Sequence, residues 1–122
     1  KRLLAFEQLT NPGQLAEIKL ATNDWEEFYA RENSWPESRP LNLDPGYITE
    51  AKLVLATTKD RDHRIYLGSG IFAEVTLFYH AGRWKNRPWT YPDYQRPEYH
   101  EFFSQCREFL RKKLREASNP PQ

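Results

Sequence analysis

The sequence has no methionine and only one cysteine, Cys106. A single thiol cannot form a disulfide within the chain, which excludes a disulfide scaffold and favours a cytoplasmic, reducing compartment. Because the chain begins at Lys1 rather than Met, we expect a processed protein or a piece of a longer one. No apolar run is long enough to cross a membrane, and none follows a basic leader, so we expect no membrane partner and no secretory signal.

Catalytic and metal-binding signatures are missing as well. The three histidines form no His-Glu-x-x-His pattern and a lone cysteine cannot form Cys-x-x-Cys, so no metal site is predicted and no cofactor is indicated. Gly68 and Gly70 lie between two strand-like runs and lack the Gly-Lys-Ser/Thr ending of a phosphate-binding loop. Residues 58–60, Thr-Lys-Asp, are similar to the guanine-binding Asn/Thr-Lys-x-Asp motif of GTPases but lack the residue between Lys and Asp. The sequence therefore identifies no catalytic residues and leaves open whether the protein is an enzyme.

What the sequence does contain is typical of a small globular domain. Its 122 residues are 39% hydrophobic and 15% aromatic, enough for one hydrophobic core without stabilising disulfides or metal ions. We predict a single domain over residues 1–117, lacking an N-terminal part, and a disordered tail over residues 118–122.

Charge is distributed unevenly along the chain. Residues 1–50 carry five basic and nine acidic side chains, a net charge of −4, whereas residues 51–122 carry thirteen basic and eight acidic ones, a net charge of +5. The second half is therefore the better place to look for an anionic partner, although solvated surface charge often produces such a difference.

Two segments have the apolar spacing of amphipathic helices, residues 13–31 and 97–116. The apolar face of the first contains Leu15, Ile18, Ala21, Trp25, Phe28 and Tyr29, and that of the second contains Tyr99, Phe102, Phe103, Cys106, Phe109, Leu110 and Leu114. Cys106 is accordingly expected to be buried and unreactive. Residues 44–58 fit either a helix or a strand, and we predict a helix capped by Asp44 or Thr49.

Residues 63–67 and 71–79 predict a β-hairpin around a three-residue loop, residues 68–70. The register that keeps apolar residues on one side pairs Arg64 with Glu74 and places Ile65 and Leu67 on the core face. Residues 83–87 predict a further antiparallel strand. The fold class is therefore α+β, a small antiparallel sheet with helices packed on one face, and a mixed α/β sheet is the alternative if residues 51–57 form a strand.

Five segments together closely resemble a prokaryotic family of uncharacterised domains: residues 42–47, 52–60, 63–68, 73–77 and 89–94. Members of that family are often labelled GTP-binding, but no activity is established for them and no active-site residues can be carried over. The resemblance implies an additional N-terminal strand and helix, so that this chain would be the C-terminal two-thirds of the usual domain.

Polar and aromatic residues of these segments lie at the ends of the predicted elements, where binding residues are usually placed. We predict that a cleft between the 63–79 hairpin and the 89–94 loop binds an anionic small molecule or a nucleotide-like ligand. The predicted ligand-binding residues are Asp44, Lys59, His63, Arg64, Tyr66, Glu74, Tyr91 and Asp93. A simple cross-strand ion pair between Arg64 and Glu74 is the structural alternative.

Two other functions remain open. Residues 83–96 interleave cations with aromatic rings, as RNA-binding surfaces do, and an exposed row of Trp84, Trp89 and Tyr91 would favour that function. A large exposed apolar patch would instead favour a protein-interaction or assembly module.

Overall fold

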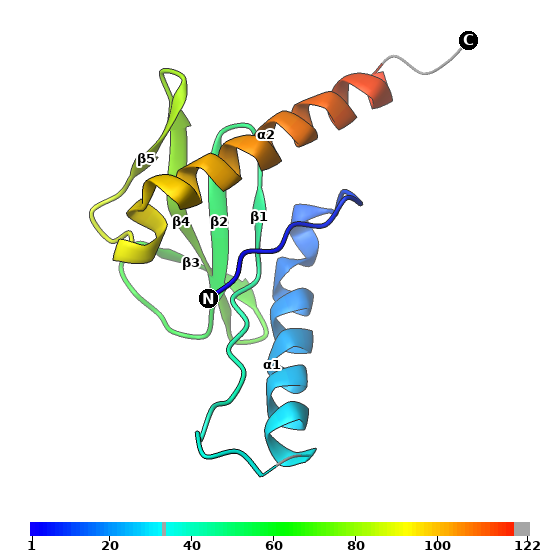
Figure 1. The fold of residues 1–122 in the computed structure, drawn as a ribbon, viewed down its shortest axis with the longest axis vertical. Coiled ribbons are helices and arrows are strands. Elements are labelled where there is room, and N and C mark those ends of the chain that lie inside the picture. The colour runs from blue at the N-terminus through cyan, green and yellow to red at the C-terminus, as the bar shows by residue number, and fades with distance from the viewer. Residues whose placement is uncertain (33, 119–122) are drawn as a thin grey trace. The chain divides into compact units, whose positions relative to one another are not determined.

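The computed structural model describes residues 1–32 and 34–118 (Figure 1). Two α-helices, two short 3-10 helices and five strands follow one another in the described part of the chain. Their order is η1 (Pro12–Gln14), α1 (Leu15–Glu32), β1 (Gly46–Ile48), β2 (Lys52–Thr57), β3 (Arg64–Gly68), β4 (Ile71–His80), β5 (Arg83–Asn86), η2 (Pro92–Gln95) and α2 (Pro97–Ser118). Helix α2 thus includes Ser118, and the rest of the predicted tail lies outside the described residues.

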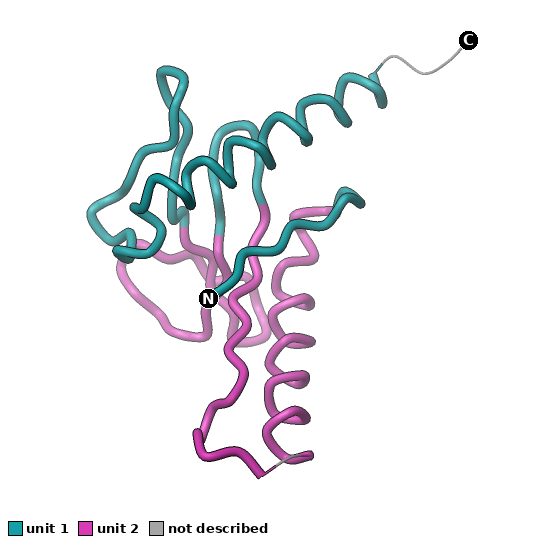
Figure 2. Tube along the Cα trace, viewed as in Figure 1, with its two compact units in different colours: residues 1–10, 48–54, 75–122 teal, residues 11–47, 55–74 magenta. Residues whose placement is uncertain are grey.

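The five strands form one antiparallel sheet in the order β1-β2-β4-β3, with β5 also paired to β4. This arrangement confirms the predicted α+β class. By contacts, the chain divides into two compact units (Figure 2). Unit 1 comprises residues 1–10, 48–54 and 75–122, and unit 2 comprises residues 11–47 and 55–74. The single-domain boundary at residue 117 stays a prediction.

The predicted helix over residues 44–58 is wrong, because this segment forms β1 and β2. The two strands make a hairpin in which the Thr49 and Ala56 amides donate to the carbonyls of Lys52 and Pro45. Thr49 accepts from the Ala51 and Lys52 amides through its hydroxyl, so it stabilises a turn instead of capping a helix. Three of the six β2 residues are buried, which is why an apolar run of this length suits a strand.

The β3–β4 hairpin has the predicted register along most of its length. Arg64 pairs with Glu74, and the next two pairs agree as well. The three-residue loop is wrong, however, because Gly68 pairs directly with Ile71 and a bulge falls between Tyr66 and Gly68. The turn is therefore only two residues long.

The predicted core face of this hairpin is only partly right, because Ile71 of that face is buried and the β3 residues are not. Ile65 is 70% exposed and Leu67 is exposed, whereas Arg64 and Glu74 point away from water. Strand β3 lies at the end of the strand order, and in such a strand one face can remain in solvent. A mutually neutralised ion pair can then be buried on the other face.

Within unit 1, the core forms where α2 packs on β5. The Trp84 ring lies edge-on to Tyr79 and Phe103, and Phe103 stacks parallel to Tyr94 of η2. Tyr99 and Phe103 are buried, as the helical spacing predicts, whereas Phe109 and Leu114 near the end of the helix are exposed. Figure 1 shows the last turns of α2 extending past the strands of this unit.

Helix α1 in unit 2 buries only Leu15 of its predicted apolar face and otherwise buries a different side. Its buried residues are Leu15, Lys19 and Thr22. The Lys19 ammonium donates to the Leu43 carbonyl at 3.4 Å, and the Leu43 amide donates to Glu26 at 2.6 Å. Hydrogen bonds with the backbone of Leu43 thus hold polar side chains of α1 inward. The buried side of the helix is turned by about a quarter of a rotation from its apolar stripe.

Candidate functional site

A cluster of charged side chains lies at the beginning of β3 in unit 2. Glu74 Oε1 accepts hydrogen bonds from His63 Nε2 at 2.8 Å and from Arg64 Nε at 3.1 Å. Arg64 Nη1 donates in addition to the Lys59 carbonyl at 3.0 Å. The structure therefore brings together four of the eight predicted ligand-binding residues.

The hairpin register positions this cluster, since it places Arg64 directly opposite Glu74. The Arg64 and Glu74 side chains are only 8% and 5% exposed, and that of His63 is 16% exposed. Ion pairs this deeply buried are fixed in orientation, because leaving either charge without its partner would be costly. The cluster can therefore hold the His63 ring and the Arg64 guanidinium rigidly at the end of a loop that also carries Lys59.

The remaining predicted residues of unit 2 have local roles. The exposed Asp44 accepts from Asn42 at 3.4 Å. The Tyr66 hydroxyl accepts from the Gly70 amide at 3.1 Å and its ring lies 5.1 Å from that of Phe72, which supports the hairpin turn.

Tyr91 and Asp93 belong to unit 1. Tyr91 is exposed, and Asp93 accepts from the Lys1 ammonium at 2.8 Å. This hydrogen bond lowers the pKa of Asp93 and raises that of Lys1. The cleft between the hairpin and the 89–94 loop would need residues of both units and stays a prediction.

The basic and aromatic residues of the 83–96 stretch do not form an exposed row of rings. Trp84 is 4% exposed, and Trp89 Nε1 donates to the Val75 carbonyl at 2.8 Å. The Thr90 hydroxyl donates to the Thr76 carbonyl at 2.6 Å and accepts from the Arg87 amide at 2.8 Å. These bonds fasten the stretch to β4 within unit 1, so two of the three rings serve the fold.

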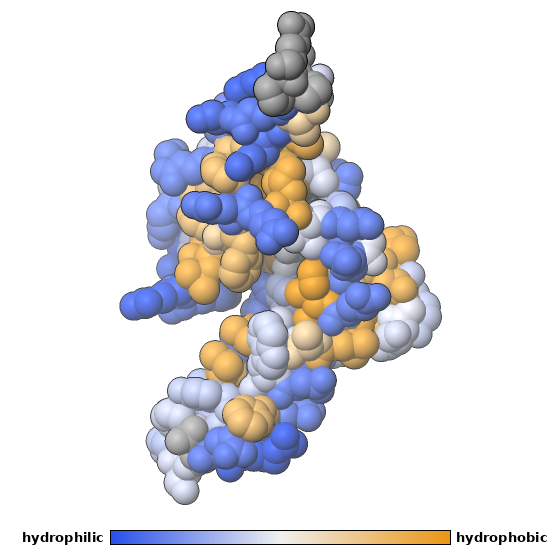
Figure 3. Space-filling model, turned by 90° about the vertical axis from the view of Figure 1, so that its right-hand side faces the viewer, coloured by the Kyte–Doolittle hydropathy of each residue, from blue (hydrophilic) through white to orange (hydrophobic). Residues whose placement is uncertain are grey.

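The largest departure from expectation is the apolar stripe of α1, which lies at the surface. Trp25 is 61% exposed and Phe28 is 58% exposed, and Ile18 is exposed on the same side. Tyr29 stacks on Trp35 with ring centroids 5.0 Å apart, at the end of the stripe. Hydrophobic residues reach the surface in patches between charged ones (Figure 3). Soluble domains seldom leave several large apolar side chains together in water unless something docks there.

This exposed face could not be recognised from the spacing alone. The same spacing describes a helix that packs on its own sheet and a helix that presents its stripe to a partner. The signal in the sequence was the polar set Lys19, Thr22 and Glu26, which also repeats at helical spacing and finds its partners inside unit 2.

Cys106 in α2 is half-buried instead of fully buried, so the predicted burial is only partly right. Burial raises the pKa of its thiol, in the direction expected for an unreactive cysteine. Among the residues that the structure describes, no three His, Cys, Asp or Glu side chains are grouped as metal ligands. No helix in the described ranges has the length and apolar character needed to cross a membrane.

The fold and the charged cluster define an α+β domain without a recognisable catalytic constellation among its described residues. The chain belongs to the family described as a domain of unknown function, DUF4416, whose model matches residues 1–109. This match confirms the resemblance to a family of uncharacterised domains. No curated protein and no solved structure is similar enough to the chain to count as a match.

Proposed function

We propose that this domain is a protein-interaction module whose docking surface is the apolar stripe of α1, defined as Ile18, Ala21, Trp25, Phe28 and Tyr29. The observation that carries the proposal is the exposure of Trp25 and Phe28 on one side of a helix that is anchored through another side. Large aromatic side chains are typical of the residues that contribute most to binding energy at interfaces. The single cysteine fits the cytosol, which we propose as the compartment.

Anchoring through polar bonds makes the stripe suitable for docking. Lys19 and Glu26 hold α1 to the segment around Leu43, so the helix does not depend on its apolar stripe for attachment within unit 2. A partner can cover Trp25 and Phe28 without displacing any of these bonds. Such a preformed surface loses little conformational entropy on association.

Photo-crosslinking in living cells tests this proposal. A photoreactive phenylalanine analogue at position 25 in the full-length protein should give one specific adduct, identified by mass spectrometry. Ile18→Glu in the same chain should abolish that adduct, because it places a charge in the stripe, about two helical turns from position 25. The analogue at position 83, an exposed site in β5, is the matched control. Equal labelling from positions 25 and 83, or no adduct at all, would refute a docking role.

The charged cluster favours a second function, binding of an anionic small molecule or nucleotide. Glu74 fixes His63 and Arg64 at the end of the 58–63 loop, which also carries the exposed Lys59 and Arg61. The exposed cations of this loop suit charge-assisted hydrogen bonds to phosphate, and the bond from Arg64 to the Lys59 carbonyl fixes the path of the loop. We do not propose RNA binding, because the burial of Trp84 and the bond of Trp89 leave too few rings for stacking.

Titration with inorganic phosphate and with ATP, followed by thermal shift, tests the anion site. Lys59→Ala and Arg64→Lys should each weaken binding, and loss of a hydrogen bond to a charged group costs about 1.5–3 kcal/mol. Arg83→Ala should leave the affinity unchanged. If neither anion raises the melting temperature, the anion-binding function is wrong.

A further inference from the structure

The inference concerns the partner of the α1 stripe and rests on the proposed function. We infer that α1 of one copy of this protein docks on the last turns of α2 of a second copy. Three observations lead to it: the charge around the α1 stripe, the charge and exposure at the end of α2, and a hollow in the surface of α2.

Acidic residues outnumber basic ones on α1 and lie along one border of the exposed stripe. Helix α1 contains five acidic and two basic side chains, a net charge of −3. By helical spacing, Glu17 and Asp24 lie along one border of the stripe, and both are exposed. A partner that covers Trp25 and Phe28 must therefore bring apolar groups together with positive charge.

The last turns of α2 have that composition. Residues 107–118 contain five basic and two acidic side chains, a net charge of +3. Leu110, Leu114 and Ala117 continue the apolar side of the helix, and Leu114 and Ala117 are exposed. The core of unit 1 covers this side farther toward the N-terminus, at Tyr99 and Phe103. The end of α2 therefore carries an exposed apolar strip bordered by more cations than anions, with Arg111 also paired to Glu50 and Glu108.

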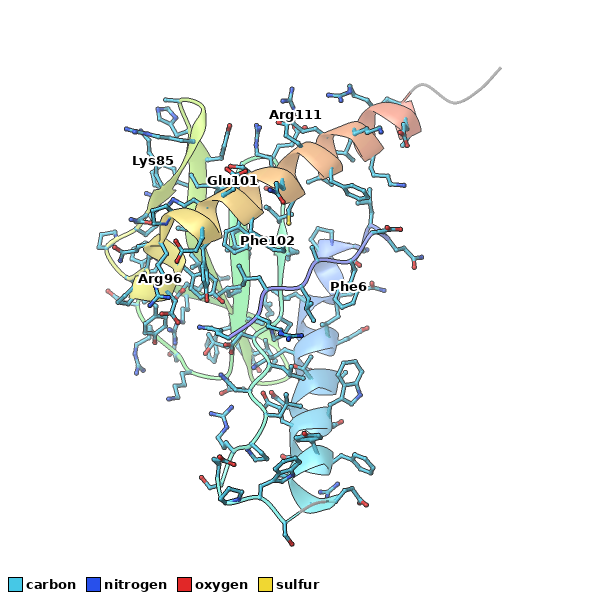
Figure 4. The ribbon with its side chains drawn as sticks, viewed as in Figure 1. Phe6, Lys85, Arg96, Glu101, Phe102 and Arg111 are labelled. Carbon is cyan, nitrogen blue, oxygen red and sulfur yellow. The ribbon has the colours of Figure 1, made fainter. Side chains whose placement is uncertain are left out.

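A shallow hollow lies beside this strip, lined by Glu50, Arg111, Leu114, Arg115 and Ser118. Its volume is about 270 Å³ and it is open to solvent, so it can accept a protruding side chain. Phe102 and Arg111 project from opposite sides of α2 (Figure 4). An indole ring seated against Leu114 would lie next to Arg111 and Arg115, where cation–π attraction adds to apolar contact.

Charge selects this pairing over the other pairing of copies that uses the same stripe. Two α1 helices from different copies would face each other with a net charge of −3 each, and like charges across an interface are unfavourable. Pairing α1 with α2 of a second copy joins opposite charges and covers both apolar surfaces. Helix α1 lies in the half of the sequence with a net charge of −4, and α2 lies in the half with a net charge of +5. This pairing between copies therefore brings the acidic half of one chain against the basic half of the other.

Charge reversal tests the inference with the full-length protein in sedimentation velocity. The α1 variant carries Glu17→Lys and Asp24→Lys, and the α2 variant carries Arg111→Glu and Arg115→Glu. The unmodified protein should self-associate, more weakly at high salt, and each variant alone should have at least a tenfold weaker self-association. A mixture of the two variants should associate again, because each variant then meets a surface of opposite charge. One chain with all four changes should also self-associate.

Control variants and adverse outcomes complete the test. Glu37→Lys and Arg83→Glu reverse exposed charges elsewhere and should leave association unchanged. Far-ultraviolet circular dichroism establishes that each variant is folded. A monomer at all concentrations, or a dimer that neither reversal weakens, would overturn the inference. If the purified protein is monomeric while position 25 crosslinks a different protein in cells, the inference fails and the docking function stands.

Discussion

Arg64 and Glu74 face each other across the β3–β4 hairpin, with Arg64 Nε 3.1 Å from Glu74 Oε1 and both side chains almost fully removed from water. Glu74 also accepts a bond from His63, so one carboxylate neutralises Arg64 and orients both neighbouring side chains. The pair occupies the hairpin face that an alternating pattern would reserve for solvent.

Replacement of Glu74 should therefore destabilise the fold strongly. Glu74→Gln removes the negative charge and leaves the Arg64 guanidinium buried without its counter-ion, a change that costs about 3–5 kcal/mol for buried pairs. Urea unfolding of the wild type and the variant measures this difference. Glu116→Gln, at an exposed position in α2, should change the free energy of unfolding by less than about 0.5 kcal/mol. Equal effects of the two substitutions would contradict a structural role for the pair.

The same pair shows how far the sequence could predict this hairpin. The register from Arg64 to Tyr66 was predictable. Apolar and polar residues alternate along both strands, and with glycines at the turn only one pairing keeps the apolar residues on one face. The face that is buried was not predictable in the same way. Burial of Arg64 becomes favourable only once Glu74 and the Lys59 carbonyl are in place, and the Lys59 contact depends on the path of the preceding loop.

The two long helices show a similar contrast. The position of α2 and the burial of Tyr99 and Phe103 were predicted well, because its stripe repeats over many turns and its first half packs against the aromatic residues of unit 1. The existence of α1 was predictable too, but its buried side was not. That side is set by Lys19 and Glu26 through their bonds to the backbone of Leu43, a contact across a long separation in sequence. Of the candidate site, the local group around Glu74 could be predicted, and the docking stripe could not.

Thr90 should contribute to stability through its hydroxyl, which is buried in unit 1. The hydroxyl donates to the Thr76 carbonyl and accepts from the Arg87 amide. Thr90→Val keeps the shape and leaves both backbone groups without this partner, so the free energy of unfolding should fall by about 1–3 kcal/mol. Thr90→Ser retains the hydroxyl and should lose less. The comparison is made by chemical denaturation, and a serine variant as unstable as the valine variant would show that the methyl group matters instead.

The contact between Lys1 and Asp93 should make stability depend on pH in the acid range. The hydrogen bond from Lys1 lowers the pKa of Asp93 in the folded state, so its contribution is present above the ordinary carboxyl pKa of about 4 and is lost as pH falls through the lowered value. Asp93→Asn should therefore have a lower free energy of unfolding than the wild type at about pH 6. This difference should be smaller at about pH 2.5. Urea unfolding at both pH values measures it. With Asp60→Asn, a change at an exposed loop residue, no comparable narrowing is expected.

The turn between β4 and β5 should accept a stabilising substitution. His80 pairs with Arg83, and the two residues between them, Ala81 and Gly82, have φ angles of 51° and 81°. Two consecutive positive φ angles define a type I′ turn, which favours Asn followed by Gly, whereas the left-handed conformation is strained for Ala. Ala81→Asn should therefore raise the free energy of unfolding by up to about 1 kcal/mol. Gly82→Ala should lower it by roughly 1–2 kcal/mol through backbone strain alone, because no atom beyond the two neighbouring residues lies within 4 Å of the added methyl group. Thermal and urea unfolding of both variants test this account of the turn. A destabilising Ala81→Asn or a neutral Gly82→Ala would contradict it.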